Sequence, residues 1–283
     1  MFGVSSTPQA GHRHEIVWIA LRDRPTDGVA IGAISTALRR SWLEANYRRM
    51  VRLTFALLPS PLLGPEAWGP VAEVLRSGGW SVLEQAGAAE PPGAPGGVLK
   101  RFLAALPTDR DLVLVPHSNA GLYVPELTRK RRVIGYVFVD AILPPDSGTV
   151  PVAPQHLVTE LESLADESGI LPPWTAWWGE DDLRDLYPDP DTRGRIEEQA
   201  PRIPARYLRS TISLPVNWNR YPGAYLAFGD TYAEDRATAL ALGWPTATIT
   251  GRHLHQLHQP DVVAERILAL TRQAGLESLS PSR

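Results

Sequence analysis

The chain has 283 residues, of which 43% are hydrophobic and 21% charged, with a formal net charge of −3 and no cysteine. This composition is typical of a globular protein with a sizeable core, and it excludes disulfides, thiolate chemistry and cysteine-bound zinc. The chain lacks an excess of positive charge and any apolar run near the ~20 residues of a membrane helix. We therefore expect a cytoplasmic enzyme or binding protein with a small-molecule partner and with neither a nucleic-acid nor a membrane partner.

Residues 1–49 differ in composition from the rest of the chain. They contain seven Arg and no Lys against four carboxylates, a local charge of +3. No turn pattern connects their short apolar run, residues 16–21, with the helical pattern of residues 37–49. We predict an N-terminal appendage over 1–49, which could be poorly ordered, ahead of the main domain.

From residue 51 onward, short apolar runs alternate with helical patterns. The predicted strands are 51–58, 80–83, 111–115 and 133–139, and the predicted helices are 65–77, 98–106 and 119–130. This alternation predicts crossover units and hence an α/β fold, with a mostly parallel sheet covered by helices on both faces.

The alternation is interrupted by a proline-rich, helical stretch over residues 143–222. It then resumes with predicted strands at 224–228 and 246–249 and predicted helices at 233–242 and 260–273. An insertion of this length must be a structural unit of its own. We predict a core formed by 50–142 and 223–273, a helical cap over 143–222 inserted before the last two strands, and a tail over 274–283.

The strongest local pattern lies at residues 111–122, where a predicted strand leads into Ser118 and a helix follows. Small residues, Ala120 and Gly121, come two and three positions after the serine. This arrangement suits a serine on a tight strand-to-helix turn, beside helix amides that favour a developing anion. The alternative is that Ser118 only caps the helix. The neighbouring His117 is expected to be a packed, hydrogen-bonded residue that points away from the serine.

This segment resembles the G-x-S-x-G nucleophile turn of the α/β-hydrolase family, with Pro116 and Ala120 at the two glycine positions. The resemblance covers about residues 50–272 and implies the α/β-hydrolase fold, a serine nucleophile and the chain order Ser, acid, His. Residues 59–68, 172–174 and 243–245 are also similar to segments of small actinobacterial α/β-hydrolase-like proteins with no defined substrate.

The segment from Gly251 to Pro260 is similar to the histidine segment of this family, in which a proline opens the last helix. His253 matches the catalytic histidine by its distance from both ends. His255 and His258 are interpreted as structural residues. A metal site at the three histidines is not favoured, because no carboxylates accompany them at ligand spacing.

Two candidates for the triad acid remain open, Asp140 and Asp230. The common family pattern after the predicted strand 224–228 is G-x-x-D, but here Tyr232 holds the acid position and Asp230 comes two residues early. Asp140 follows the predicted strand 133–139, which in a right-handed crossover sheet lies beside the serine strand. This placement slightly favours Asp140. Glu234 and Asp235 are interpreted as solvated helix residues.

The oxyanion donors implied by the resemblance are the amide of Asn119 and one from the loop after the first strand. The aligned position in that loop is Pro61, which has no N–H, so Leu62 is the substitute. Loss of one donor typically costs about 10²–10³ in rate.

Three tryptophans, Trp174, Trp177 and Trp178, lie close together in the predicted cap. They either pack the cap against the core or form an apolar wall of a substrate pocket, since such pockets are mostly apolar. The acidic run 180–182 beside them is expected to be a solvated helix start.

Two functions follow from these residues. The first is a serine hydrolase or acyl transferase acting on an ester, thioester or lactone of a small apolar molecule, free or on a carrier, without a cofactor. The second is a non-hydrolytic protein of the same fold that binds, isomerises or cyclises a natural product. A homodimer is compatible with either function.

Overall fold

The computed structural model of the protein describes residues 53–84 and 93–276, which all belong to one compact unit of the chain. The predicted appendage over 1–49 and the tail residues 277–283 lie outside the described residues. Among the described residues, no helix is both long enough and apolar enough to cross a membrane.

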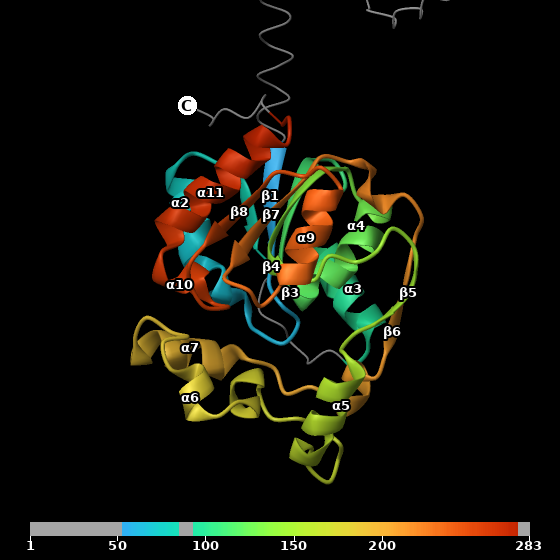
Figure 1. Ribbon diagram of the computed structural model, residues 1–283, viewed down its shortest axis with the longest axis vertical. Coiled ribbons are helices and arrows are strands. Elements are labelled where there is room, and N and C mark those ends of the chain that lie inside the picture. The colour runs from blue at the N-terminus through green and yellow to red at the C-terminus, as the bar shows by residue number, and fades with distance from the viewer. Residues whose placement is uncertain (1–52, 85–92, 277–283) are drawn as a thin grey trace, which may run out of the picture. The chain divides into compact units, whose positions relative to one another are not determined.

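The core is a six-stranded parallel sheet with the strand order β2-β1-β3-β4-β7-β8 (Figure 1). Its strands are β1 (Leu53–Leu58), β2 (Val82–Glu84), β3 (Asp111–Ser118), β4 (Val133–Ala141), β7 (Gly223–Phe228) and β8 (Thr246–Ile249). Register is set by pairs such as Phe55 with Val113 between β1 and β3, and His117 with Val139 between β3 and β4. The predicted parallel sheet is thus confirmed.

Helices cover both faces of the sheet (Figure 1). One face carries α2 (Gly69–Ser77), α10 (His255–His258) and α11 (Pro260–Gln273), and the other carries α3 (Pro95–Ala105), α4 (Val124–Lys130) and α9 (Ala233–Ala241). Short 3-10 turns, η1 (Pro65–Ala67) and η2 (Asn119–Tyr123), precede α2 and α4, so the single helices predicted at 65–77 and 119–130 are each divided.

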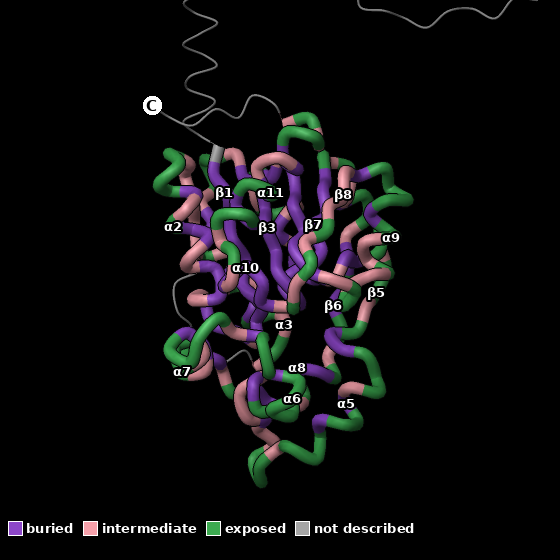
Figure 2. The backbone as a smooth tube through the Cα atoms, turned by 60° about the vertical axis from the view of Figure 1, so that its left-hand side comes forward, coloured by how far each residue is buried: buried purple, intermediate pink, exposed green. Residues whose placement is uncertain are grey.

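Side chains of each strand alternate between the two faces, as a two-residue period requires. In β1, Phe55 and Leu57 join the hydrophobic cluster beneath α2 and α11, whereas Ala56 and Leu58 join the larger cluster on the other face. The central strands are therefore buried on both sides, and Figure 2 shows them as an almost continuous buried layer.

The inserted segment, residues 143–222, leaves the sheet after β4 and returns at β7. It contains β5 (Gly148–Pro151), α5 (Gln155–Leu161), η3 (Glu162–Leu164), η4 (Trp174–Trp177), α6 (Glu180–Leu183), α7 (Pro190–Gln199), α8 (Ala205–Leu208), β6 (Thr211–Leu214) and η5 (Trp218–Arg220). The expectation of a helical segment was incomplete, because β5 and β6 form an antiparallel pair.

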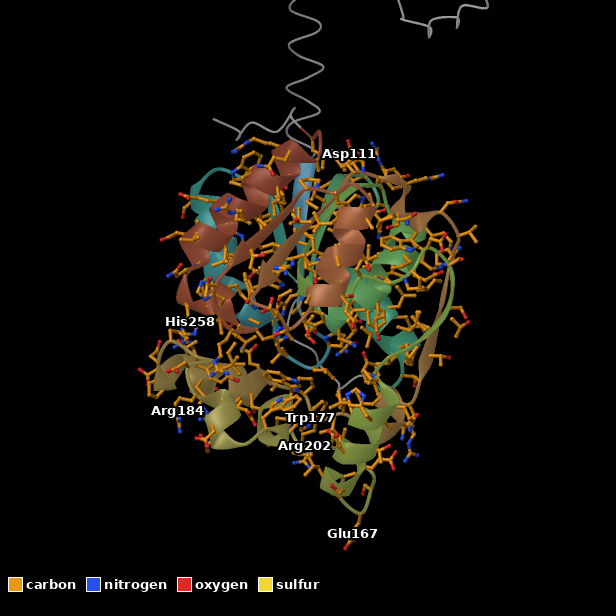
Figure 3. All side chains as sticks on the ribbon, viewed as in Figure 1. Asp111, Glu167, Trp177, Arg184, Arg202 and His258 are labelled. Carbon is orange, nitrogen blue, oxygen red and sulfur yellow. The ribbon has the colours of Figure 1, made fainter. Side chains whose placement is uncertain are left out.

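The inserted segment lies at the carboxyl ends of the parallel strands. Asp111, the first residue of β3, is at the opposite end of the sheet from Trp177 and Arg184 of the inserted segment (Figure 3). Loops that follow β3, β4, β7 and β8 therefore meet between the sheet and this segment, where open α/β sheets bind their ligands.

Candidate active site

Ser118 lies on a strained turn between β3 and η2, with φ 58° and ψ −129°. A non-glycine residue rarely adopts such a conformation, which holds the side chain above the sheet edge. The turn is tight because Ser118 carbonyl accepts the Ile142 amide at 3.1 Å, and a Cβ on Gly121 would collide with the Ile142 carbonyl oxygen. Glycine at 121 is therefore required by the close approach of Ile142, the residue directly after β4.

Asp140 lies at the end of β4, adjacent to the serine strand, and is completely buried. Its φ of 42° is left-handed, a conformation in which Asp is enriched among non-glycine residues. One carboxylate oxygen accepts the Phe228 amide at 2.9 Å, and the other accepts the Nδ1–H of His253 at 2.6 Å. These two bonds fix the carboxylate between the end of β7 and the histidine loop.

The position of His253 is fixed by a hydrogen bond to its backbone carbonyl as well as by the hydrogen bond of its ring to Asp140. The buried His117 donates its Nε2–H to the His253 carbonyl oxygen at 2.9 Å, and the two rings stack with centroids 4.5 Å apart. Burial, followed by the nearness of His253, lowers the pKa of His117 well below its ordinary value, so His117 is neutral. His117 is thus packed and hydrogen-bonded, as expected, and its hydrogen bond supports the histidine loop directly.

Asp230 is not brought to the histidine. Its side chain is 90% exposed and lies 3.7 Å from the Arg236 guanidinium. Of the two acid candidates, the structure pairs Asp140 and not Asp230 with His253, because Asp230 follows the turn at Gly229 and points to solvent.

Glu234 and Asp235, two acidic residues of α9 after this turn, differ in how far they are exposed. Glu234 is exposed as expected, but Asp235 is partly buried and accepts the Leu143 amide at 2.7 Å. Burial raises the pKa of Asp235. The expectation of a solvated residue was wrong for Asp235, which ties α9 to the start of the inserted segment.

Tyr232 is the residue that sequence reasoning missed as a member of the site. Its hydroxyl oxygen lies 3.3 Å from Ser118 Oγ, and its ring centroid lies 5.6 Å from that of His253. Burial is the main cause that raises the pKa of Tyr232, so the phenol is neutral. The available signal was its place in the sequence, since it stands where the family pattern has the acid.

The two candidate oxyanion donors, the amides of Asn119 and Leu62, belong to different segments of the structure. Asn119 is the first residue of η2, directly after Ser118, where a helix amide lacks a partner within its own helix. In the loop after β1, Pro61 has no N–H, and the Leu62 N–H donates to Ser60 Oγ at 3.4 Å. The Leu62 amide is thus turned toward its own loop by a weak hydrogen bond.

The Asn119 side chain connects the serine turn to the inserted segment. Its Nδ2 donates to the Val152 carbonyl oxygen at 2.9 Å, and its Oδ1 accepts the Tyr207 hydroxyl at 3.0 Å. The Tyr207 hydroxyl is also 2.7 Å from that of Tyr123 on η2. Both polar atoms of a buried amide are therefore satisfied by residues from near the two ends of the inserted segment.

A cavity of about 390 Å³ lies beside His253, between the inserted segment and the loops after β7 and β8. Its lining includes Trp174, Trp178, Asp182, Leu183, Leu186, Phe228, Asp230, Thr231, Gly251, Arg252 and His253. Of the three candidate tryptophans, Trp174 and Trp178 line the cavity. Trp177 instead packs against the main hydrophobic cluster and donates its Nε1–H to the Pro172 carbonyl oxygen at 2.9 Å.

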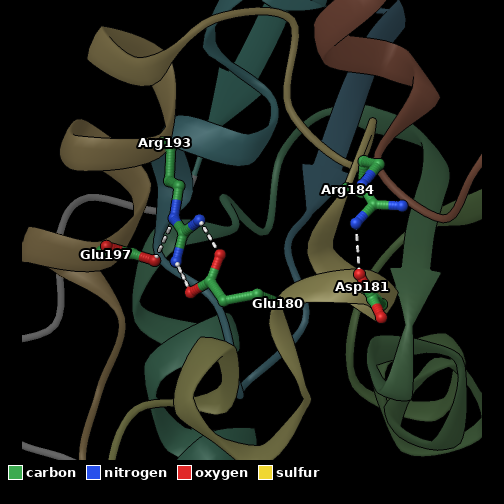
Figure 4. Close-up of polar contacts among 5 residues, drawn as sticks. All are labelled: Glu180, Asp181, Arg184, Arg193 and Glu197. Atoms are coloured by element: carbon green, nitrogen blue, oxygen red, sulfur yellow. Dashed lines mark hydrogen bonds and ion pairs between the residues drawn. The ribbon is translucent and has the colours of Figure 1, made fainter.

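Helix α6, whose Asp182 and Leu183 line this cavity, is connected to α7 by charged side chains (Figure 4). Arg193 of α7 forms two hydrogen bonds of 3.0 Å with the Glu180 carboxylate and one of 2.8 Å with Glu197. Asp181 and Arg184 form a further ion pair. Glu180 is exposed, as expected for a solvated helix start, but it also bridges the two helices.

Within the part of the chain that the structure describes, neither of the other two histidines of the segment forms an ion pair with a carboxylate. His255 and His258 stack on each other with ring centroids 5.8 Å apart. No group of three or more His, Asp or Glu within the described ranges is arranged to hold a metal ion.

These features define a class. A parallel sheet with helices on both faces, a serine on the strained turn after β3 and a histidine loop after β8 are the α/β-hydrolase fold, and the chain has that fold. The sequence matches no family model and no curated protein.

Solved structures of the same fold are similar along nearly their whole length. An extracellular α/β-hydrolase from a Paenibacillus species aligns with a TM-score of 0.61 at 21% identity, over 77% of this chain and 98% of that one. A pyrethroid hydrolase aligns with a TM-score of 0.57 at 17% identity, over 78% and 98%. Tomato methylketone synthase I aligns with a TM-score of 0.55 at 14% identity, over 79% and 99%. At these identities the likeness establishes the fold.

Proposed function

We propose that the protein is a serine-dependent enzyme that cleaves an ester, thioester or lactone of a small apolar molecule. The observation that carries the proposal is the 2.6 Å hydrogen bond from His253 Nδ1 to the buried Asp140, beside a serine on a strained turn. A carboxylate in this place holds the imidazole in the tautomer whose Nε2 can accept a proton. An esterase and a pyrethroid hydrolase among the structural neighbours agree with this chemistry.

In the proposed reaction, Ser118 Oγ attacks the carbonyl carbon while its proton passes to His253 Nε2. Asp140 stabilises the imidazolium that forms, and the Asn119 amide donates to the oxyanion. The hydroxyl of Ser118 lies against Tyr232 in the structure, so it must turn toward His253 for the attack. A χ1 change of this kind is a rotation between staggered rotamers.

The substrate side of the proposal rests on the cavity beside His253. Its walls are largely aromatic and aliphatic, from Trp174, Trp178 and Phe228 among others, and a volume of about 390 Å³ suits one small molecule. The inserted segment supplies the tryptophans and would act as the cap of the site. A carrier-bound acyl group could enter from the exposed side, where Trp178 is 37% exposed.

The test is the substitution Ser118→Ala, assayed on p-nitrophenyl esters and acyl thioesters of increasing acyl length. Turnover should fall to the background rate, while the melting temperature stays close to that of the wild type. Retained turnover in this variant would refute the serine mechanism. Ser213→Ala is a matched control, because Ser213 is an exposed residue of β6 in the inserted segment.

Two observations favour a second candidate, a non-hydrolytic protein of this fold. Pro61 lacks the N–H of an oxyanion donor, and Ser118 Oγ is covered by Tyr232. Both features would weaken acyl transfer but would not hinder binding or rearrangement of a ligand in the cavity. A fluorophosphonate probe separates the two candidates: labelling of Ser118 supports hydrolysis, and a folded protein that is not labelled supports the second function.

A further inference from the structure

Tyr232 occupies a position that the triad does not need. It follows β7 and the turn at Gly229, where the family pattern has the acid, but the Nδ1–H of His253 is already bound by Asp140. The phenol ring packs beside the His253 ring, and the hydroxyl reaches past it to Ser118 Oγ. The reacting oxygen of the proposed enzyme therefore has a second polar group next to it.

The strand order decides on which side of Ser118 this hydroxyl lies. β1 and β7 are on opposite sides of β3 in the order β1-β3-β4-β7. The loop after β1, with Pro61 and Leu62, and the loop after β7, with Tyr232, therefore approach the serine from opposite sides. Tyr232 cannot replace the missing oxyanion amide of Pro61. It lies on the side of His253, which is where the leaving group must be because His253 gives it a proton.

We propose that Tyr232 is a further catalytic residue, whose hydroxyl donates a hydrogen bond to the leaving-group oxygen of the ester. The proposal rests on the serine mechanism proposed above. At 3.3 Å the contact with Ser118 Oγ is longer than the usual O–H···O hydrogen bond, so it is weak and can be exchanged for a bond to substrate.

The step balances without a proton from Tyr232. The Ser118 proton goes to His253 Nε2 as the Oγ–carbon bond forms. When the tetrahedral intermediate collapses, the bond from the carbonyl carbon to the leaving oxygen breaks, and that oxygen takes the proton from His253 and departs as an alcohol. The Tyr232 hydroxyl keeps its own proton and stabilises the negative charge that grows on the leaving oxygen.

The surroundings of Tyr232 keep it a donor. Burial, and to a smaller degree the carboxylates of Asp140 and Asp235, raise the pKa of the phenol. Its hydroxyl therefore remains protonated over the whole range in which a His253 base would work. Its hydrogen bond should matter most for leaving groups that carry the most negative charge on oxygen.

The experiment compares Tyr232→Phe with the wild type on two esters of the same acid, a p-nitrophenyl ester and an ethyl ester. The nitrophenolate spreads its charge and needs little help, whereas the ethoxide does not. Loss of one hydrogen bond should lower kcat/KM for the ethyl ester by about tenfold and for the p-nitrophenyl ester by less than about threefold. Equal losses on both esters, no loss, or a gain from uncovering Ser118 would overturn the proposal.

A matched control is Tyr221→Phe, which also removes a phenol hydroxyl. Tyr221 lies just before β7, at the opposite end of that strand from Tyr232, and its hydroxyl accepts a hydrogen bond from Arg220 at 3.2 Å. This variant should keep both rates. Replacement of Tyr232 by 3-fluorotyrosine, which retains the hydroxyl, should keep the ethyl-ester rate within about threefold of the wild type. A loss as large as that of Tyr232→Phe would show that packing matters instead of the hydroxyl, and would also overturn the proposal.

Failure of the serine mechanism gives a different result. If Ser118→Ala keeps the wild-type rate on either ester, or the wild type hydrolyses neither, the proposed function fails and the role of Tyr232 fails with it. If Ser118→Ala abolishes turnover but Tyr232→Phe affects both esters alike, only the role of Tyr232 is refuted.

Discussion

Asp140→Asn is the substitution that tests the candidate triad most directly, because it changes one buried atom and removes one charge. The Asn carbonyl can still accept the Phe228 amide, as Asp140 Oδ1 does at 2.9 Å. Its NH2 group then faces His253 Nδ1, which must become an acceptor. The proton of the neutral imidazole moves to Nε2, and that nitrogen can no longer take the Ser118 proton.

The expected loss in kcat follows from this wrong tautomer and is about 10⁴. The fold should survive, since the hydrogen bond to β7 is kept. Steady-state kcat on the best ester of the panel, together with a melting curve, measures both quantities. Asp109→Asn is the matched control, because the same chemical change is made on an exposed side chain just before β3, at the end of the sheet opposite the site, and it should lose less than about threefold. A kcat for Asp140→Asn within tenfold of the wild type, or an equal loss in the control, would refute the triad.

The other predictions concern stability and binding. His117 is neutral in the folded protein because its pKa is held well below the ordinary value, so below about pH 6.5 the unfolded chain binds one more proton and the stability should fall as the pH is lowered. Between pH 7 and pH 5, the melting temperature of His117→Asn should therefore fall less than that of the wild type. An identical fall in the two proteins would contradict this. Gly121→Ala should lower the melting temperature by at least about 5 °C, because a Cβ there collides with a backbone carbonyl, whereas Gly96→Ala, which meets nothing within 4 Å, should not lower it. Trp178→Ala should raise KM several-fold with little effect on stability, since Trp178 lines the cavity and is 37% exposed. Trp177→Ala should mainly lower the melting temperature, since Trp177 packs against the main hydrophobic cluster. A raised KM for Trp177→Ala and a lowered melting temperature for Trp178→Ala would be evidence against the cavity as the substrate site.

The central sheet was predictable because its strands are short, continuous apolar runs separated by helical patterns. The same physics placed Asp140 beside Ser118, since a right-handed crossover puts consecutive parallel strands next to each other. That adjacency is observed between β3 and β4. The β5 and β6 pair was missed because its two four-residue strands are brought together from distant parts of the inserted segment, and neither has a local turn pattern that predicts pairing.

Contacts between loop side chains were the least predictable part of the site. His117 contacts a residue 136 positions away, and Tyr232 contacts one 114 positions away. Periodicity gives the face of a helix or strand, but it does not give the direction of a side chain on a turn. The departure of Tyr232 from the family pattern was visible in the sequence, whereas its approach to Ser118 depends on the backbone after Gly229.

The bonds of the Asn119 side chain limit how far the two parts of this protein can be exchanged with those of other proteins. Val152 and Tyr207, near the two ends of the inserted segment, satisfy the Asn119 amide. A chimera that takes residues 143–222 from another protein of the fold must again present a carbonyl oxygen and a hydroxyl at these two points, because each group of the buried amide left unsatisfied costs about 1–3 kcal/mol beside the nucleophile turn. Recombination of this region therefore depends on the match between the side chain at position 119 and the segment that covers it.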